Sequence, residues 1–243
     1  MDTIIHNLQH VQARIDKACQ AVGRDPKEVK LLLATKTVTP ERIQQALAAG
    51  YTLIAENKVQ ELKEKYEALK ATPHTNHFIG HLQTNKIKDI LKYDVSCVES
   101  LDRYDLAEKL HQKLSQAGRE MDVFIQVNTS GEESKFGVAP EEALALTQQV
   151  AQLPTLHIRG LMTIGLFSAE EDKVRKCFQL LKSIQQQIFA LNLPDVQPHE
   201  LSMGMSGDLE VAIAEGATIV RVGTAIFGQR IYPDSYYWNE QKA

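Results

Sequence analysis

The stretch LLLATKTVTPERIQQALAAG, residues 31–50, contains one complete strand-and-helix unit. Its apolar run ends at Lys36, and TPE at 39–41 is a typical helix start, with a hydroxyl at the cap and a proline in the first turn. Gly50 is a suitable C-terminal stop for that helix. The stretch therefore predicts a short buried strand followed by a helix, with a lysine where the strand ends.

Short apolar runs alternate with helical patterns along the rest of the chain. Besides residues 30–35, strands are predicted over residues 52–56, 77–80, 94–100, 121–128, 156–164, 199–203 and 217–223. Further helices are predicted over residues 58–70, 83–92, 102–117, 140–152, 170–190 and 206–215. Strands that alternate with helices of this length indicate a parallel sheet.

Eight such units predict an α/β protein with a single (β/α)8 TIM barrel domain over residues 1–243. A doubly wound open sheet is the alternative for the same order of elements. An extra N-terminal helix is predicted because apolar residues recur there at helical spacing. They are Ile4, Leu8, Val11, Ile15 and Val22. The C-terminal segment IYPDSYYWNEQKA has no periodicity, and we expect a packed or frayed tail.

The composition is that of a soluble globular protein, with 43% apolar and 24% charged residues. A net charge of −4 argues against a nucleic-acid-binding protein, and we expect no membrane span and no signal peptide. Three scattered cysteines indicate a reducing compartment, so we expect a cytoplasmic protein. His74, His77 and His81 lack a supporting metal motif, so no metal site is predicted.

The loops that follow the strands form the active face of such a barrel, so side chains at the strand exits should meet in space. The residues at these exits are Lys36, Glu56, Asn57, His81, Asn128, Met162, Thr163, the range from Ser202 through Met205 to Ser206, Arg221 and Gly223.

The last two of these loops, SMGMSGD at 202–208 and VGTAIFG at 222–228, have the composition of a phosphate site. Their glycines let backbone N–H groups approach an anion, and Ser206, at the start of a predicted helix, adds a hydroxyl and the helix dipole. Thr224 adds a second hydroxyl. A plain strand-to-helix turn with a Ser cap is the alternative, but two such loops in the two expected places favour phosphate binding.

Arg221 lies two residues before Gly223, so both point to the same face of the strand. A guanidinium directed into a barrel mouth needs an acceptor, because a buried unpaired charge is costly. One hypothesis is a structural ion pair with Glu56 or Asp208. The other is a contact with the ring nitrogen or phosphate of a bound cofactor.

Lys36 is either a solvated strand-end lysine or a reactive amine. Desolvation at a strand end and a nearby cation, such as Arg221, would favour the neutral amine that attacks an aldehyde. An amine opposite a phosphate pocket indicates a phosphorylated aldehyde, and pyridoxal 5′-phosphate (PLP) is the leading candidate.

The same segments resemble the pyridoxal-phosphate homeostasis protein family (the YggS-like family) over nearly the whole chain. The resemblance rests on LLLATKT, AENKVQELKEKY, HFIGHLQTNKIK, QVNTSGEESKFGV, RGLMTIG and ELSMGMSGDLEVAIAEGATIVRVGTAIFG. It implies a fold similar to the barrel domain of alanine racemases. It also implies a protein that binds PLP and takes part in PLP homeostasis without catalytic turnover.

By position, the resemblance implies that Lys36 holds PLP as a Schiff base, the internal aldimine, and that Arg221 faces the pyridine nitrogen. Phosphate contacts would come from Ser206, Gly223 and Thr224. Asn57 would border the ring, and the remaining cofactor-binding residues are His81, Ser202 and Met205. Lys58 stands where the family more often has an aromatic residue, which could alter the edge of the pocket.

An arginine at the pyridine nitrogen cannot accept a proton, so the ring should be a weak electron sink. The barrel also leaves no room for the second domain of alanine racemases. We therefore expect a monomeric PLP carrier that serves PLP-accepting apo-enzymes, and not an enzyme. A PLP-dependent amino-acid racemase is the alternative, and a cofactor-free aldolase that uses Lys36 on a sugar phosphate is a third hypothesis.

Overall fold

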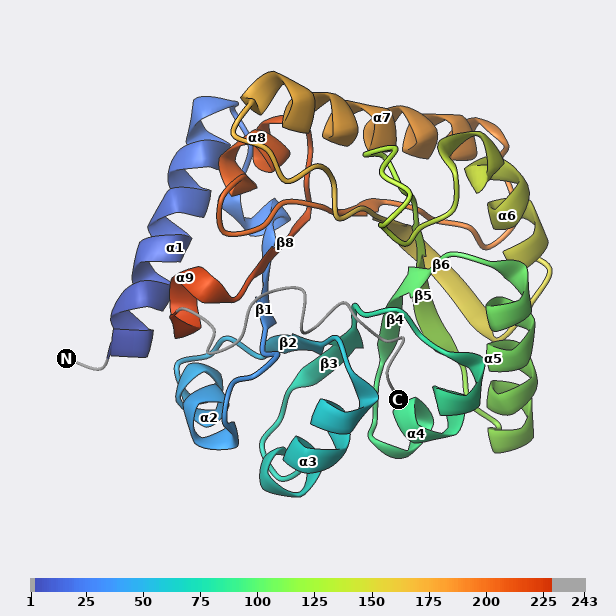
Figure 1. Ribbon diagram of the computed structural model, residues 1–243, viewed down its shortest axis with the longest axis horizontal. Helices are drawn as coiled ribbons and strands as arrows, with labels where there is room; N and C mark the ends of the chain where they lie inside the picture. The colour runs from blue at the N-terminus through green and yellow to red at the C-terminus, as the bar shows by residue number, and fades with distance from the viewer. Residues whose placement is uncertain (1–2, 229–243) are drawn as a thin grey trace.

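Eight parallel strands close into a barrel in which each strand pairs with the strands before and after it (Figure 1). The computed structural model describes residues 3–228. The strands are β1 (Lys30–Ala34), β2 (Leu53–Glu56), β3 (Thr75–Phe78), β4 (Cys97–Leu101), β5 (Met121–Gln126), β6 (Leu156–Met162), β7 (Glu200–Ser202) and β8 (Ile219–Val222). Closure occurs between β1 and β8, where Leu32 pairs with Arg221. The predicted barrel is confirmed, and the open-sheet alternative is wrong.

Helices surround the barrel on its outer side (Figure 1). They are α1 (Thr3–Ala21), α2 (Pro40–Ala48), α3 (Val59–Leu69), α4 (Ile87–Lys92), α5 (Tyr104–Ala117), α6 (Ala143–Val150), α7 (Glu171–Ala190), α8 (Leu209–Ala214) and α9 (Thr224–Phe227). Short 3-10 helices are η1 (Pro26–Glu28), η2 (Thr84–Lys86) and η3 (Pro140–Glu142). The extra helix α1 is confirmed, and it packs against α2, α8 and α9, so it fills the gap between the first and last units. None of the helices in residues 3–228 is long and apolar enough to cross a membrane.

The strands separate two apolar cores, because successive side chains point to opposite faces. On β1, Leu31 and Leu33 join the large core between sheet and helices, whereas Leu32 points into the barrel. The inner core is Leu32, Ala55, Cys97, Phe124, Met162 and Ile219. Since strands in a parallel barrel are covered on both faces, their sequences contain continuous apolar runs. The inner core fills the barrel, so polar groups of the lumen have no bulk water around them.

Some boundaries differ from the sequence predictions. Strand β3 begins and ends two residues earlier than expected, at Thr75 and Phe78. Helix α8 begins at Leu209 with Asp208 at its N-cap, so Ser206 lies in the preceding turn and not at a helix start. Val22 lies beyond α1 and is exposed. The C-terminal segment 231–243 lies outside the described residues, and its packing stays a prediction.

The end of β3 approaches the end of β2 closely at Gly80. An ideal Cβ on Gly80 would lie 1.9 Å from the carbonyl oxygen of Asn57, a contact that only glycine avoids. We predict that Gly80→Ala lowers the free energy of unfolding by about 1–3 kcal/mol, the typical cost of overpacking. Gly207→Ala is the control, because a Cβ at that position would meet no atom within 4 Å beyond its chain neighbours. Denaturant unfolding of both variants measures this, and equal losses would contradict the prediction.

Candidate active site at the barrel mouth

Closure of the barrel brings the exits of β1, β2 and β8 together. Ala34 pairs with Ala55 and Leu33 with Val222, so Lys36 follows β1 beside the segments that follow β2 and β8. A Cβ on Gly223 would lie 2.8 Å from the carbonyl oxygen of Ala34, which shows how closely the β8 exit approaches β1. Lys36 is half-buried.

The backbone changes from strand to turn just before Lys36. Leu32 points inward, and the hydroxyl of Thr35 bonds to the Glu56 carboxylate on the outer face of the sheet. Lys36 lies two residues beyond β1, in a turn that is closed by the hydrogen bond from the Val38 N–H to the Thr35 carbonyl oxygen at 3.0 Å. The pairing of β1 with β2 places the strand exits that carry Lys36 and Asn57 next to each other, and the meeting of their side chains stays a prediction.

A chain of hydrogen bonds crosses the lumen below this mouth. Arg221 Nη1 donates to Ser202 Oγ over 2.8 Å, and Ser202 Oγ donates to Glu99 Oε2 over 2.6 Å. His77 Nδ1 lies 2.6 Å from Glu99 Oε1. Since a carboxylate can only accept, Nδ1 of His77 carries the proton in this contact. Arg221 Nη2 also donates to the carbonyl oxygen of Thr163 over 2.7 Å.

These contacts decide the charge state of the lumen. Burial raises the pKa of Glu99, but the hydrogen bond and charge of His77, together with Arg221 and Ser202, hold that pKa below its ordinary value. Burial lowers the pKa of Arg221, against the attraction of Glu99. A guanidinium remains charged even so, because its ordinary pKa lies far above neutrality. The lumen therefore contains a compensated pair of charges that is linked through a serine.

Neither partner that the sequence suggested for Arg221 is its ion-pair partner among the described residues. Asp208 instead accepts from the backbone N–H of Met205 over 2.5 Å, and burial raises the pKa of its carboxyl group. Glu56 lies on the outer face of the sheet, where it pairs with Lys65 at 2.8 Å. The prediction that Glu56 belongs to the mouth is wrong because its register on β2 is opposite to that of the inward Ala55.

The loops after β7 and β8 contact each other at Ser206. The backbone N–H of Ala225 donates to Ser206 Oγ over 3.4 Å. Arg14 of α1 donates to the Ser206 carbonyl oxygen over 3.0 Å and pairs with Glu210 of α8. The extra N-terminal helix thus supports the turn that carries Ser206. Thr224 is exposed at the start of α9.

The segments that follow β2 and β3 contain two buried polar atoms without a hydrogen bond among the described residues. They are Asn57 Oδ1 and His81 Nδ1. The His81 ring stacks on Phe136, with centroids 4.0 Å apart and planes 17° apart, and its Nδ1 lies 3.7 Å from Asp102 Oδ2. Such groups usually have a ligand or water partner, because an unsatisfied buried polar atom costs free energy.

The other predicted residues have mainly structural contacts. Asn128 Nδ2 donates to the carbonyl oxygens of Glu132 and Lys135, so it closes its own loop. Met162 belongs to the inner core. Thr163 bonds through Oγ1 to Thr129 Oγ1 and through its carbonyl oxygen to Arg221.

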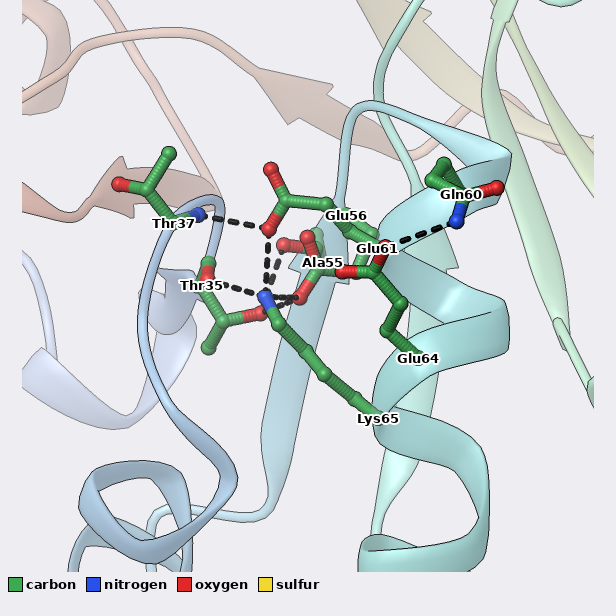
Figure 2. Close-up of polar contacts among 8 residues, drawn as sticks. All are labelled: Thr35, Thr37, Ala55, Glu56, Gln60, Glu61, Glu64 and Lys65. Atoms are coloured by element: carbon green, nitrogen blue, oxygen red, sulfur yellow. Dashed lines mark hydrogen bonds and ion pairs between the residues drawn. The ribbon is translucent and has the colours of Figure 1, made fainter. Parts of the chain in front are cut away.

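The structure also contains an ionic cluster that the sequence reasoning missed (Figure 2). Lys65 of α3 lies between Glu56 Oε1 at 2.8 Å and Glu61 Oε2 at 2.6 Å, and its side chain is 9% exposed. Burial raises the pKa of Glu56 to about 7, although the charge of Lys65 opposes the shift. The i,i+4 spacing of Glu61 and Lys65 was the available signal, but it does not reveal that Glu56 completes the cluster.

His74, His77 and His81 do not converge. His74 Nδ1 contacts the Thr72 carbonyl oxygen at 2.7 Å, His77 points to Glu99 in the lumen, and His81 stacks on Phe136. Within residues 3–228, no group of three His, Cys, Asp or Glu side chains has metal-site geometry.

Comparison with known proteins finds likeness along nearly the whole chain. The family model described as the alanine racemase N-terminal domain matches residues 1–231. The pyridoxal phosphate homeostasis protein of Aquifex aeolicus (strain VF5) is 43% identical over 228 residues, which is 93% of this chain and 97% of that protein. The protein of the same name from Pseudomonas aeruginosa is 44% identical over 232 residues, which is 96% of this chain and 98% of the relative.

A solved structure extends this likeness to three dimensions. PipY of Synechococcus elongatus PCC7942, in the structure with PLP bound, superimposes with a TM-score of 0.78 at 32% sequence identity. The match covers 88% of this chain and 100% of PipY. The sequence resemblance is therefore accompanied by the same barrel fold.

Glu56 makes stability depend on pH. Its pKa is about 7 in the folded protein against an ordinary 4.5, so the folded state binds the extra proton and the ionised form destabilises the fold. Wild-type stability should therefore fall relative to Glu56→Gln as pH rises through this interval, by about 3 kcal/mol in total. Urea unfolding from about pH 4 to about pH 8 measures the difference, because this range spans both pKa values. Glu64→Gln is the exposed control on α3, and a pH-independent difference for Glu56→Gln would contradict the prediction.

Proposed function

We propose that this chain, which belongs to the pyridoxal phosphate homeostasis protein family and has the alanine racemase N-terminal domain, binds PLP at the barrel mouth. Lys36 would bond covalently to the aldehyde carbon of the cofactor. The observation that carries this proposal is the closed strand order, in which the segment with Lys36 follows β1 next to β8, which carries the buried Arg221, and the loops after β7 and β8 contact each other. PipY, which has PLP bound in its solved structure, supports it.

The residues at the mouth fit the chemistry of the cofactor. Ser206 and Thr224 offer hydroxyls, and the backbone N–H of Ala225 already points to Ser206 Oγ at 3.4 Å. Gly223 has no side chain to cover the backbone at this point. Hydroxyls and backbone N–H groups are the usual donors to a phosphate dianion. These groups would hold the phosphate, with Ser202 at the end of β7 and Met205 in the loop that follows it.

Two polar side chains after β2 and β3 would border the ring. Asn57 Oδ1 has no hydrogen bond among the described residues, and the contact of His81 Nδ1 with Asp102 Oδ2 is long at 3.7 Å, so both atoms could interact with polar ring substituents. Within residues 3–228, the Arg221 guanidinium donates to Ser202 and to Thr163. Since a guanidinium has five N–H donors, Arg221 could also donate to a ring nitrogen.

Arg221 would also affect the reactivity of bound PLP. PLP supplies an electron sink when its pyridine nitrogen is protonated. Arg221 donates and cannot accept, so it would keep that nitrogen unprotonated. Glu99, the carboxylate of the lumen, is separated from Arg221 by Ser202 and is committed to His77 and Ser202. These features favour a protein that holds and releases PLP over a racemase.

The cellular role follows as part of the same proposal. We propose a monomeric, single-domain cytoplasmic protein that takes part in PLP homeostasis, takes up the free cofactor and supplies PLP-accepting apo-enzymes. The names of its relatives support the homeostasis role. A PLP-dependent amino-acid racemase is the alternative, because the barrel belongs to the alanine racemase N-terminal domain family.

Covalent capture by Lys36 is tested by reduction and mass measurement. Purified wild-type protein is mixed with PLP, reduced with borohydride and weighed intact, and the modified peptide is mapped. We expect one cofactor per chain on Lys36, and we expect Lys36→Ala to lose both the adduct and the visible absorbance band. Lys63→Ala, an exposed lysine on α3, is the control. An adduct that persists in Lys36→Ala would contradict the proposal, and an adduct of another mass on Lys36 would favour the aldolase hypothesis.

Chiral analysis separates the carrier from the racemase. PLP-loaded protein is incubated with L-alanine, L-serine or L-threonine in deuterium oxide, and both enantiomers and deuterium at Cα are quantified over time. We expect no more conversion than free PLP produces at the same concentration, because Arg221 weakens the electron sink. Sustained conversion above that of free PLP would establish a racemase and overturn the carrier role.

A further inference from the structure

Helix α3 fixes the two peptide groups on either side of Lys36. Lys65 Nζ donates to the carbonyl oxygen of Thr35 over 2.8 Å, and Glu61 Oε2 accepts from the backbone N–H of Thr37 over 2.6 Å (Figure 2). The first group belongs to the peptide that precedes the Cα of Lys36, and the second to the peptide that follows it. Because the orientations of these two planes define φ and ψ of a residue, the contacts determine the backbone conformation of Lys36.

The ammonium group of Lys65 is fully used in this arrangement. Its three N–H groups match three acceptors, namely the Thr35 carbonyl oxygen, Glu56 Oε1 and Glu61 Oε2. Lys65 is 7% exposed and Glu56 is 2% exposed, so these contacts exclude most water. Charge-assisted hydrogen bonds are stronger than neutral ones, and removing one partner leaves another buried charge unpaired.

Thr35 is held a second time through its side chain. Its hydroxyl lies 2.6 Å from Glu56 Oε1, and its backbone N–H donates to the Ala55 carbonyl oxygen over 3.0 Å. Glu56 thus connects the end of β2 to the residue before Lys36. The segment 35–37 leaves β1 but stays attached to both β2 and α3.

Thr37 needs such support, because its backbone is strained. Its φ is +63°, in the left-handed region that a β-branched residue rarely adopts. A conformation of this kind is unfavourable in itself and persists only where surrounding contacts impose it. The bond from the Thr37 N–H to Glu61 is such a contact, so without it the chain could relax and Lys36 would change direction.

We infer that Lys65 and Glu61 are positioning residues for Lys36, which act from the outer face of the barrel by fixing its backbone. This inference rests on the proposed covalent binding of PLP. Capture joins Lys36 Nζ to the aldehyde carbon and releases one water, made of the aldehyde oxygen and two amine protons, so no oxidant or reductant is needed. A fixed backbone keeps the amine at the mouth and reduces the conformational freedom lost in this step.

The positioning residues act at a distance from the ligand. Glu56 and Lys65 line a cavity of about 200 Å³ on the flank of the barrel, together with Tyr66, Asn76 and Tyr93. The outward register of Glu56 and Asn76 places this cavity between the sheet and α3, on the side of the sheet opposite to the inner core. Substitutions of Glu61 or Lys65 should therefore change the reactivity of Lys36 without removing a contact to the phosphate.

The test compares a ligand that can react with Lys36 with one that cannot. PLP and pyridoxamine 5′-phosphate share the ring and phosphate, but only the first has an aldehyde. For Glu61→Ala and Lys65→Met we expect the rate constant of PLP capture to fall about tenfold or more, with the affinity for pyridoxamine 5′-phosphate unchanged within about twofold, which matches a loss of orientation rather than of binding. Stopped-flow absorbance and calorimetry measure these quantities.

Matched variants separate positioning from a general loss of structure. Glu61→Gln keeps an oxygen acceptor for the Thr37 N–H, so it should retain most of the capture rate that Glu61→Ala loses. Lys63→Met and Glu64→Gln are exposed controls on the same helix and should behave as wild type. The side chain of Glu61 is 13% exposed and lies at the edge of the cluster, so its loss should disturb the fold less than the loss of Lys65. Glu61→Ala therefore tests the positioning role even if Lys65→Met does not fold.

The outcomes also distinguish the two proposals. If wild-type protein captures no PLP, the proposed function and this inference are both wrong. If wild type captures PLP and Glu61→Ala does so at the same rate, the positioning role alone is overturned. Equal losses for PLP and pyridoxamine 5′-phosphate would overturn it as well, because they would mean that the whole mouth has been disturbed.

Discussion

Closure of the sheet between its first and last strands is the constraint on which the site depends. Leu32 and Leu33 of β1 pair with Arg221 and Val222 of β8, although these residues are about 190 positions apart in the sequence. The pairing places the segment that contains Lys36 next to the segment that contains Gly223 and Thr224. An open sheet built from the same units would leave β1 and β8 unpaired, and Lys36 would be separated from the loop that follows β8. The chemistry proposed here is therefore a consequence of the barrel topology.

Two buried polar networks support the mouth from opposite sides of the sheet. Inside the barrel, Arg221, Ser202, Glu99 and His77 form a continuous hydrogen-bonded chain. Outside it, Lys65 joins Glu56 and Glu61 to the backbone around Lys36. Buried ionic groups contribute little net stability compared with apolar packing, but they require defined geometry. Both networks end near the mouth. The inner network ends at the guanidinium of Arg221, and the outer network ends at the backbone on either side of Lys36. This arrangement is what a site that must present two groups at fixed positions requires.

The order of elements was predictable because each β/α unit has its own local signals. Thr39 and Pro40 mark the start of a helix by their own residue types, whatever the exact end of the preceding strand. The apolar runs likewise identify buried strands without knowledge of which strands pair. The exits of β1 and β8 could also be paired from the barrel topology alone. Local signals fail for Ser206, because Asp208 provides the N-cap of α8 and binds the Met205 N–H. The helix consequently begins three residues later than the sequence suggested.

The polar networks were not predictable, because each depends on the face to which a side chain points. Glu56 and Asn57 are adjacent in sequence, yet Glu56 pairs with Lys65 behind the sheet. Glu99 and His77 meet because β3 and β4 are neighbours: His77 pairs with Cys97, and Glu99 is the next residue of β4 on the same face as Cys97. A one-residue change of register would exchange the two faces, and strand ends cannot be located that finely from sequence.

The central claim, that Lys36 is the covalent attachment point of PLP at this mouth, is tested most directly by a crystal structure of the protein soaked with PLP. We expect continuous electron density from Lys36 Nζ to the cofactor, with the phosphate between Ser206 and Thr224 and the ring nitrogen facing Arg221. Density for PLP at another lysine, or a phosphate outside the loops after β7 and β8, would contradict it.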